Sequence, residues 1–315
     1  MEFLHALFIE PFASMIDNPA FLLEVVIGGL LSGVMYSLVA LGFVLIYKAS
    51  GVFNFAQGTM VLFAALTFVG LLERGVPVWA AFLITALVMV ILAFIIERVV
   101  LRPLVNQPQI TLFMATIGLS FFVEGIAQLA WGANVRALDL GIADEPIEWL
   151  MDRTGMNVSK FDLAASGIAA ALVSVLGVFF NKTRTGRALR AVADDHQAAL
   201  AVGISLQRIW VIVWITAGFV ALVTGLLWGA RNGVQFALTF LALKALPVLI
   251  LGGLDSVVGA IVGGLIVGAS EKLAEVYIGP HVGGGIESWF PYALALLFLL
   301  ARPEGLFGER RIDRV

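Results

Sequence analysis

Residues 28–47 read GGLLSGVMYSLVALGFVLIY and contain no charged side chain. About 20 apolar residues are what an α-helix needs to cross ~30 Å of hydrocarbon at 1.5 Å per residue. Similar apolar runs recur along the chain, because 61% of its 315 residues are hydrophobic and 13% are charged, against about 25% charged in a soluble domain. The sequence therefore predicts an all-α polytopic membrane protein and excludes a water-soluble fold.

The apolar runs predict a single transmembrane domain, 1–315, with eight or nine transmembrane helices. Several runs are shorter than about 18 residues, so the number depends on whether short neighbouring runs each cross the membrane. The run at 237–253 could instead be re-entrant, which would leave eight crossings. The runs lie at 22–47, 58–72, 77–97, 109–131, 163–180, 209–230, 237–253, 256–274 and 287–301.

The distribution of Lys and Arg predicts the orientation, since cytoplasmic connections are enriched in both. The segment 181–208 is basic and is predicted to be a cytoplasmic loop, whereas 131–162 is acidic and is predicted to be an external loop. Counting back from these loops places the N-terminal segment 1–21 outside, where its apolar side chains suit an interfacial helix. Nine spans place the tail, 302–315, in the cytoplasm, and eight place it outside; its basic character favours nine spans and a cytoplasmic tail.

No motif for metal, nucleotide or enzyme chemistry occurs in the chain. It has no cysteine and 3 scattered histidines, so neither a thiolate site nor a metal cluster is expected. It lacks the G-x-x-x-x-G-K-[ST] loop that binds nucleotide phosphates, and its net charge of −3 offers no basic face to nucleic acid. We therefore expect no catalytic residue, no cofactor and no nucleic-acid partner for this chain.

Charged side chains inside the predicted spans are candidates for function, because a charge at bilayer depth costs about 2.5 kcal/mol or more. Glu124 and Lys244 are the clearest, and both are expected to face the protein interior or an aqueous path. A purely structural pairing between helices would explain them equally well. Glu97 and Glu271 lie nearer the ends of spans, where an anchoring role at the interface is expected.

Glycine occurs 33 times and is frequent within the predicted spans. Gly259 with Gly263, and Gly264 with Gly268, form two overlapping pairs with the four-residue spacing that lets helix backbones approach closely. Most such pairs only pack neighbouring helices. We assign these four glycines to helix packing.

The stretch 186–204 reads GRALRAVADDHQAALAVGI. Its alanine content predicts a short helix, and Gly203 is a natural stop after it. Arg190 and Asp194 are four residues apart and could pair on one helical face. A small alanine-rich helix between two spans suits the groove of a partner protein better than lipid, although an ordinary solvated loop helix has the same composition.

Together with several other motifs, this stretch resembles the permease subunits of ABC importers for branched-chain amino acids, of the first-permease, high-affinity type. The resemblance covers about residues 25 to 308. It departs from the family at Gln57, where histidine is usual, and at Asp255, which interrupts a glycine-rich turn. The motifs that carry it, in order, are the run at 28–47, VFNFAQG at 52–58, TRTGRALRAVADDHQAALAVGI at 183–204, ALKALPVLILGGLDSVVGAIVGGLIVG at 242–268 and RPEGLFG at 302–308.

The resemblance implies a machine in the bacterial inner membrane with a second permease, two ATPase subunits that bind ATP and Mg²⁺, and an external solute-binding protein. The loop 181–208 would be the coupling loop that docks on the ATPases, and Asn54, Phe55 and Gln57 would shape an inner turn of the translocation path, to which Glu124 and Lys244 are also assigned. The implied coupling residues are Arg187, Ala188, Arg190, Ala191, Asp194, Asp195, Ala198 and Gly203.

The sequence does not exclude other solutes or other classes of transporter. Related importers carry urea, short amides and small carboxylates. An ion-coupled secondary transporter could use Glu124 and Lys244 for its coupling ion, but it would have no need of the helix within 186–204. A passive channel would show a selectivity filter, and a membrane enzyme would show an acid, a base and a nucleophile.

Overall fold

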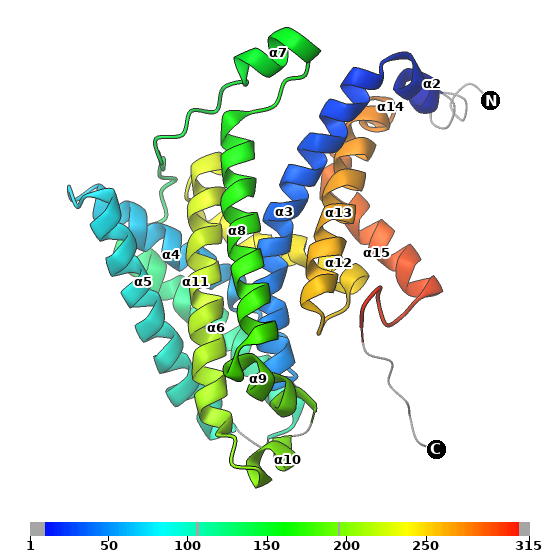
Figure 1. Cartoon of the computed structure of the whole chain (residues 1–315). Helices are drawn as coiled ribbons and strands as arrows, with labels where there is room; N and C mark the ends of the chain where they lie inside the picture. The colour runs from blue at the N-terminus through cyan, green and yellow to red at the C-terminus, as the bar shows by residue number, and fades with distance from the viewer. Residues whose placement is uncertain (1–9, 105–106, 195, 309–315) are drawn as a thin grey trace.

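The computed structural model describes residues 10–104, 107–194 and 196–308 (Figure 1). Within these residues the regular elements are all helices, accompanied by two isolated bridges, Arg136 with Val234 and Pro146 with Ser159. The prediction of an all-α polytopic membrane protein is confirmed.

Each of the nine predicted apolar runs corresponds to helix, but the helices fall into two length classes. Six are long and apolar enough to cross a membrane: α3 (Pro19–Ser50), α5 with its continuation through η1 and η2 (Val78–Leu104), α6 (Gln109–Trp131), α8 (Lys160–Lys182), α11 (Leu206–Asn232) and α13 (Val257–Tyr277). Three are shorter: α4 (Gln57–Leu72), η3 with α12 (Phe236–Gly252) and α15 (Phe290–Ala301). The remaining helices lie between these spans or before them: α2 (Glu10–Asp17), α7 (Glu148–Thr154), α9 (Arg184–Asp194), α10 (His196–Ala201), α14 (Gly279–Val282) and η4 (Ile286–Ser288).

The two loops that were predicted to face opposite sides of the membrane lie at opposite ends of the molecule. Figure 1 shows α2, α7 and α14 at one end, called here the α7 end, and α9 and α10 at the other, called the α9 end. The start of α3 belongs to the α7 end, where the Asn157 backbone N–H donates to the Glu24 carboxylate at 3.0 Å.

The chain after α15 lies toward the α9 end. The backbone N–H groups of Leu306 and Phe307 donate to the carbonyl groups of Leu251 and Gly252, at 2.8 and 3.0 Å. Phe307 also lines a pocket together with Arg190 of α9. The start of the tail is therefore at the end of the molecule that nine spans predict; residues 309–315 of the predicted tail lie outside the described residues.

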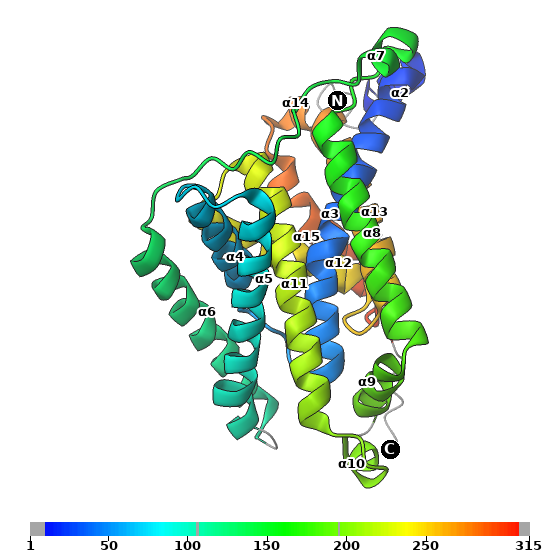
Figure 2. The same cartoon turned by 60° about the vertical axis from the view of Figure 1, so that its left-hand side comes forward.

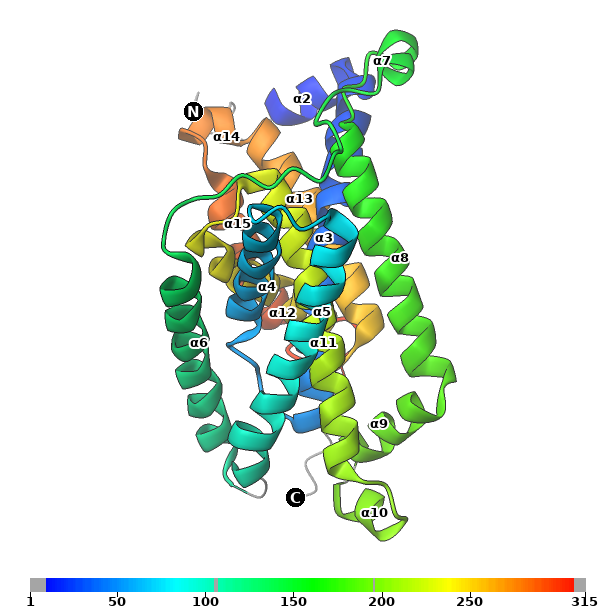
Figure 3. The same ribbon diagram turned by 90° about the vertical axis from the view of Figure 1, so that its left-hand side faces the viewer.

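The core is formed by α3, α4 and α11. Residues 35–46 of α3 and 57–70 of α4 are all buried, and α11 contacts both helices. Figures 2 and 3 show α5 and α6 on one side of this core and α8 on another. In Figure 3, α4 begins near the middle of the bundle rather than at the α9 end. Protein encloses this short helix along residues 57–70. Burial on every face accounts for its apolar composition.

Glycines on two faces of α13 let it pack tightly against two neighbours. A Cβ atom at Gly264 or Gly268 would overlap the backbone of α3 around Gly33 and Gly29. On the other face, a Cβ at Gly259 or Gly263 would overlap the backbone of α12 at Gly252 or Val248. The four glycines assigned to packing thus belong to two separate interfaces of one helix.

Candidate functional site

Three polar side chains from three different helices meet inside the membrane-spanning region. The Lys244 ammonium of α12 lies 3.6 Å from the Glu271 carboxylate of α13, and the Tyr36 hydroxyl of α3 donates to the same carboxylate at 3.0 Å. The Lys244 Nζ also lies 5.9 Å from the centre of the Tyr36 ring. This group, called here the charged cluster, satisfies one buried carboxylate with a cation and a hydroxyl.

The helices position the charged cluster through packing that the sequence only partly reveals. Trp228 of α11 stacks on the Tyr36 ring with centroids 5.5 Å apart, which fixes that ring between α3 and α11. The close glycine contacts between α13 and α3 place Glu271 beside Tyr36. A sequence signal existed, since Gly264, Gly268 and Glu271 follow the i, i+4, i+7 spacing of one helical face.

The structure corrects the interfacial assignment of Glu271. Its side chain is only 8% exposed and is paired with Lys244, whose side chain is 36% exposed. A partly exposed ammonium at this depth is costly in lipid. The Lys244 side of α12 therefore faces water or another protein rather than hydrocarbon.

The interfacial assignment of Glu97 is also wrong. Glu97 lies in the π-helical segment η1 (Ile96–Leu101) and is buried. Its Oε1 has no hydrogen-bond partner in the described part of the chain. A π-helical turn lifts one residue out of the α-helical repeat, so an α-helical reading of the sequence could not place this side chain.

Glu124 is not brought to Lys244. It is half-buried on α6, between the buried Val123 and the open Gly125, while the preceding Phe121 and Phe122 are exposed. Among the described residues no hydrogen bond or ion pair of its carboxylate is found. The role of Glu124 in a translocation path stays a prediction.

The turn at 51–56 reverses the chain between α3 and α4 and buries its polar residues. Gly51 adopts a positive φ of 69° that ends α3. The Asn54 side-chain oxygen accepts from the Ala56 N–H at 3.1 Å, and the Phe55 ring packs edge-to-face on Phe113 at 5.0 Å. The Asn54 side chain is therefore used locally to hold the turn.

Gln57 joins three helices of the core. It is 0% exposed, and its Nε2 donates to the Ala217 carbonyl of α11 at 3.3 Å. A Cβ at Gly42 of α3 would overlap this amide, so the two helices close around it. The Gln57 Oε1 has no partner within the described residues. In this conformation Gln57 contacts neighbouring helices rather than an open path, and its assignment to the path stays a prediction.

The predicted coupling loop forms two helices, α9 and α10, rather than one. One face of the pair is buried, through Gly186, Leu189, Val192 and Ala199. Gly203 adopts a φ of 83° directly after α10, which confirms it as the stop. The implied coupling residues divide by exposure: Arg187, Asp194, Ala198 and Gly203 are exposed, and Ala188, Arg190 and Ala191 are half-buried. Asp195 lies outside the described residues.

Arg190 binds the end of α8 and not Asp194. Its guanidinium donates to the Phe180 carbonyl at 2.8 Å and to the Asn181 carbonyl at 3.4 Å. These carbonyls belong to the last turn of α8, which favours a cation. Gly186 passes so close to Phe180 that a Cβ would overlap its carbonyl group. The two contacts fold α9 back beneath α8.

The exposed part of this segment also includes apolar side chains. Leu200 is 55% exposed and Val202 is 74% exposed, at the far end of the molecule. A pocket of about 450 Å³ lies beside them and is lined by Leu200, Gly203 and Arg102. The segment therefore presents both charged and apolar surface beyond the spans.

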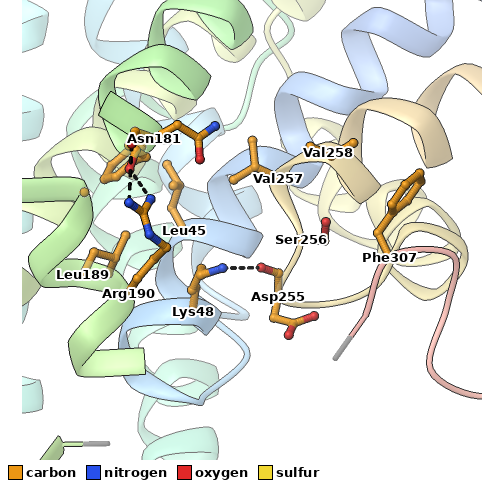
Figure 4. A pocket seen from close by; sticks show the side chains of 12 residues that line it. Leu45, Lys48, Asn181, Leu189, Arg190, Asp255, Ser256, Val257, Val258 and Phe307 are labelled. Atoms are coloured by element: carbon orange, nitrogen blue, oxygen red, sulfur yellow. Dashed lines mark hydrogen bonds between the residues drawn. The ribbon is translucent and has the colours of Figure 1, made fainter. Parts of the chain in front are cut away.

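No metal site is found in the part of the chain that the structure describes, where no three His, Cys, Asp or Glu side chains gather. A pocket of about 170 Å³ does lie at the α9 end, bordered by Lys48, Arg190 and Asp255 (Figure 4). A larger pocket of about 580 Å³ shares Lys48 and Asp255 with it and continues between the ends of α12 and α15.

Comparison with known proteins gives consistent matches. The family model for "Branched-chain amino acid transport system / permease component" matches residues 25–301. The high-affinity branched-chain amino acid transport system permease protein LivH of Salmonella typhimurium is 28% identical over 306 residues, 94% of this chain and 98% of the relative. The corresponding protein BraD of Pseudomonas aeruginosa is 28% identical over 305 residues, 93% of this chain and 98% of the relative. A more distant match is the fructose import permease protein FruF of Bifidobacterium longum, 24% identical over 75% of this chain and 66% of the relative.

Proposed function

Since the chain belongs to the family of branched-chain amino acid transport system permease components, we propose that it is the permease subunit of an ATP-driven importer for branched-chain amino acids. It would form the translocation path with a second permease in the bacterial inner membrane. Two ATPase subunits would bind at the α9 end, and a solute-binding protein would deliver solute at the α7 end. Energy would come from the partners' ATP and Mg²⁺, because this chain has no nucleotide motif of its own.

The α9–α10 segment is the observation that carries this proposal. It projects beyond the spans, and its attachment is specific, through the Arg190 contacts with α8 and the close passage of Gly186. Rigid attachment lets movement of the segment reach α8, and α8 contacts α3. A merely solvated loop helix would need neither contact.

The charged cluster supports a proposal for the face of the protein that lines the path. Lys244 is partly exposed within the membrane-spanning region, on the short helix α12. Because lipid is an unfavourable neighbour for its ammonium, we assign this side of α12 to an aqueous path shared with the second permease. Glu271 and Tyr36 would hold Lys244 in place from behind.

The family relatives favour branched-chain amino acids as the solute. LivH and BraD match nearly the whole chain, whereas the fructose permease FruF matches three quarters of it. Urea, short amides and small carboxylates are the competing solutes, and Gln57, at the position where histidine is usual, is the clearest departure from the family. Uptake of labelled leucine, fructose and urea by the reconstituted importer separates them; leucine transport is expected.

The coupling role is tested by co-purification in mild detergent of the chain with its co-expressed partners. Arg187→Glu combined with Asp194→Lys reverses two exposed charges of α9 and leaves Arg190 intact. We expect two ATPase subunits to co-elute with the wild-type chain and to be lost from this variant. Arg153→Glu, on the exposed surface of α7, is the matched control and should retain them.

A folded wild-type chain that never associates with an ATPase would contradict the importer assignment. An ion-coupled carrier would then be the alternative, and it would show uptake driven by a proton or sodium gradient without ATP. Family membership makes that outcome the less expected one.

A further inference from the structure

The pocket between α3, α8, α9 and the start of α13 combines charged and apolar walls (Figure 4). It has a volume of about 170 Å³. Lys48, Arg190 and Asp255 contribute charge, and Leu45, Val257 and Phe307 contribute apolar surface. A site of this composition suits a ligand with a charged head and a hydrocarbon part.

The two cations of the pocket keep donors free. Lys48 Nζ donates to the backbone carbonyl of Asp255 at 3.2 Å, and Arg190 uses two of its N–H groups on α8 carbonyls. An ammonium has three donors and a guanidinium has five. Neither cation forms an ion pair with a carboxylate among the described residues.

Asp255 does not neutralise the pocket. Figure 4 shows the Lys48 ammonium pointing to the Asp255 carbonyl, while the carboxylate of Asp255 is directed away from it. Two cations thus face one turned-away carboxylate, and the pocket carries positive charge. Such a site attracts an anion with several acceptor oxygens.

The place of the pocket indicates where the anion comes from. Figure 1 shows α8 and α13 on either side of α3, and the pocket lies where these helices reach the α9 end. Exposed apolar side chains continue along both helices, Val175 and Val178 on α8 and Val258 at the start of α13. Basic pockets between spans at the cytoplasmic side bind anionic lipid head groups.

We propose that this pocket binds the phosphate group of an anionic phospholipid, with Lys48 and Arg190 contacting the phosphate oxygens. The acyl chains lie along α8 and α13. Because α9 forms one wall through Leu189 and Arg190, the lipid holds α9 against the end of α3. The site concerns lipid binding, so it goes beyond the transport function and does not depend on which solute is carried.

The test is lipid retention by the purified full-length chain with its co-expressed partners, measured by native mass spectrometry after mixing with equal amounts of phosphatidylglycerol and phosphatidylcholine. Lys48→Gln removes the charge but keeps an N–H donor for the Asp255 carbonyl. We expect it to reduce phosphatidylglycerol retention about fivefold, because this is the contribution of one basic side chain to binding at an anionic membrane surface. Lys48→Arg should retain the lipid, and so should the matched control Lys182→Gln, which removes an exposed charge at the end of α8 outside the pocket.

Equal retention of the two lipids by wild type would overturn the proposal, and so would unchanged phosphatidylglycerol retention by Lys48→Gln. A third arm adds inorganic phosphate at millimolar concentration to the wild-type mixture. If phosphate displaces the lipid completely, the pocket takes free phosphate in preference and the lipid assignment is wrong. Persistence of the lipid supports it.

Discussion

Lys244 contacts Glu271 and Tyr36, and the contributions of these contacts to stability and to transport can be tested with single substitutions. Lys244→Met leaves the Glu271 carboxylate with Tyr36 as its only close partner among the described residues. We expect it to lower stability by about 1–3 kcal/mol, less than for a fully buried pair because Lys244 is partly exposed. Combining it with Glu271→Leu removes both charges and should recover most of that loss.

Leucine uptake by the same two variants tests whether Lys244 also lines the translocation path. If Lys244 lines the path, the double variant remains deficient in leucine uptake even though its thermal unfolding in detergent is close to that of wild type. Uptake that recovers together with stability would show that the pair is structural only.

The depth of a residue in the membrane can be predicted from the sequence, whereas the rotation of its helix cannot. Lys244 was singled out because its position in an apolar run requires a partner. Its partner Glu271 was missed, because distance to the end of a run says nothing about which face the residue occupies. Arg190 was paired with the wrong group, since the backbone carbonyls of α8 are not visible as a sequence motif.

At the scale of elements, the turn from α8 into α9 depends on Gly186. Gly186→Ala is expected to displace α9, because the new methyl group would overlap the Phe180 carbonyl. We expect ATP hydrolysis by the assembled importer to lose its dependence on solute. The amount of bound ATPase should stay unchanged or decrease only in part. Gly177→Ala in the same helix α8, where nothing lies within 4 Å of the new Cβ, is the control and should behave as wild type.

The contact of α13 with α3 gives a second prediction for elements. Gly268→Ala should destabilise the protein by about 1–3 kcal/mol, because its Cβ would overlap backbone atoms of α3 that cannot rotate away. Gly167→Ala on the exposed side of α8 should be neutral or stabilising by up to about 1 kcal/mol. Thermal unfolding of the two variants measures the difference, and equal stabilities would contradict the packing described here.

The nine apolar helices could be predicted almost completely, because each requires only an apolar run of sufficient length. The sequence could not show whether the short apolar helices cross the whole membrane. The run 58–72 reads like a span, but α4 begins inside the bundle, at a turn whose buried hydrogen bonds involve residues from α6 and α11. Tertiary contacts of this kind leave no periodic signal in the run itself.

For the whole molecule, the number of crossings can be tested by labelling, since the chain has no native cysteine. Met151→Cys on α7, Ala201→Cys on α10 and Pro303→Cys after α15 place single thiols at exposed positions. An impermeant maleimide added to intact cells should label only the first, and all three should react after permeabilisation. Labelling of Pro303→Cys from outside would contradict nine spans.

The hydrogen bond between Tyr36 and Glu271 joins residues 235 positions apart in the chain. At a synthesis rate of about 5–20 residues per second, α3 leaves the ribosome on the order of 10–50 s before α13 follows it. During that interval the glycines of α3 that contact α13, Gly29 and Gly33, lack their native neighbour. We therefore expect lipid or the insertion machinery to cover this face of α3 until α13 has been synthesised.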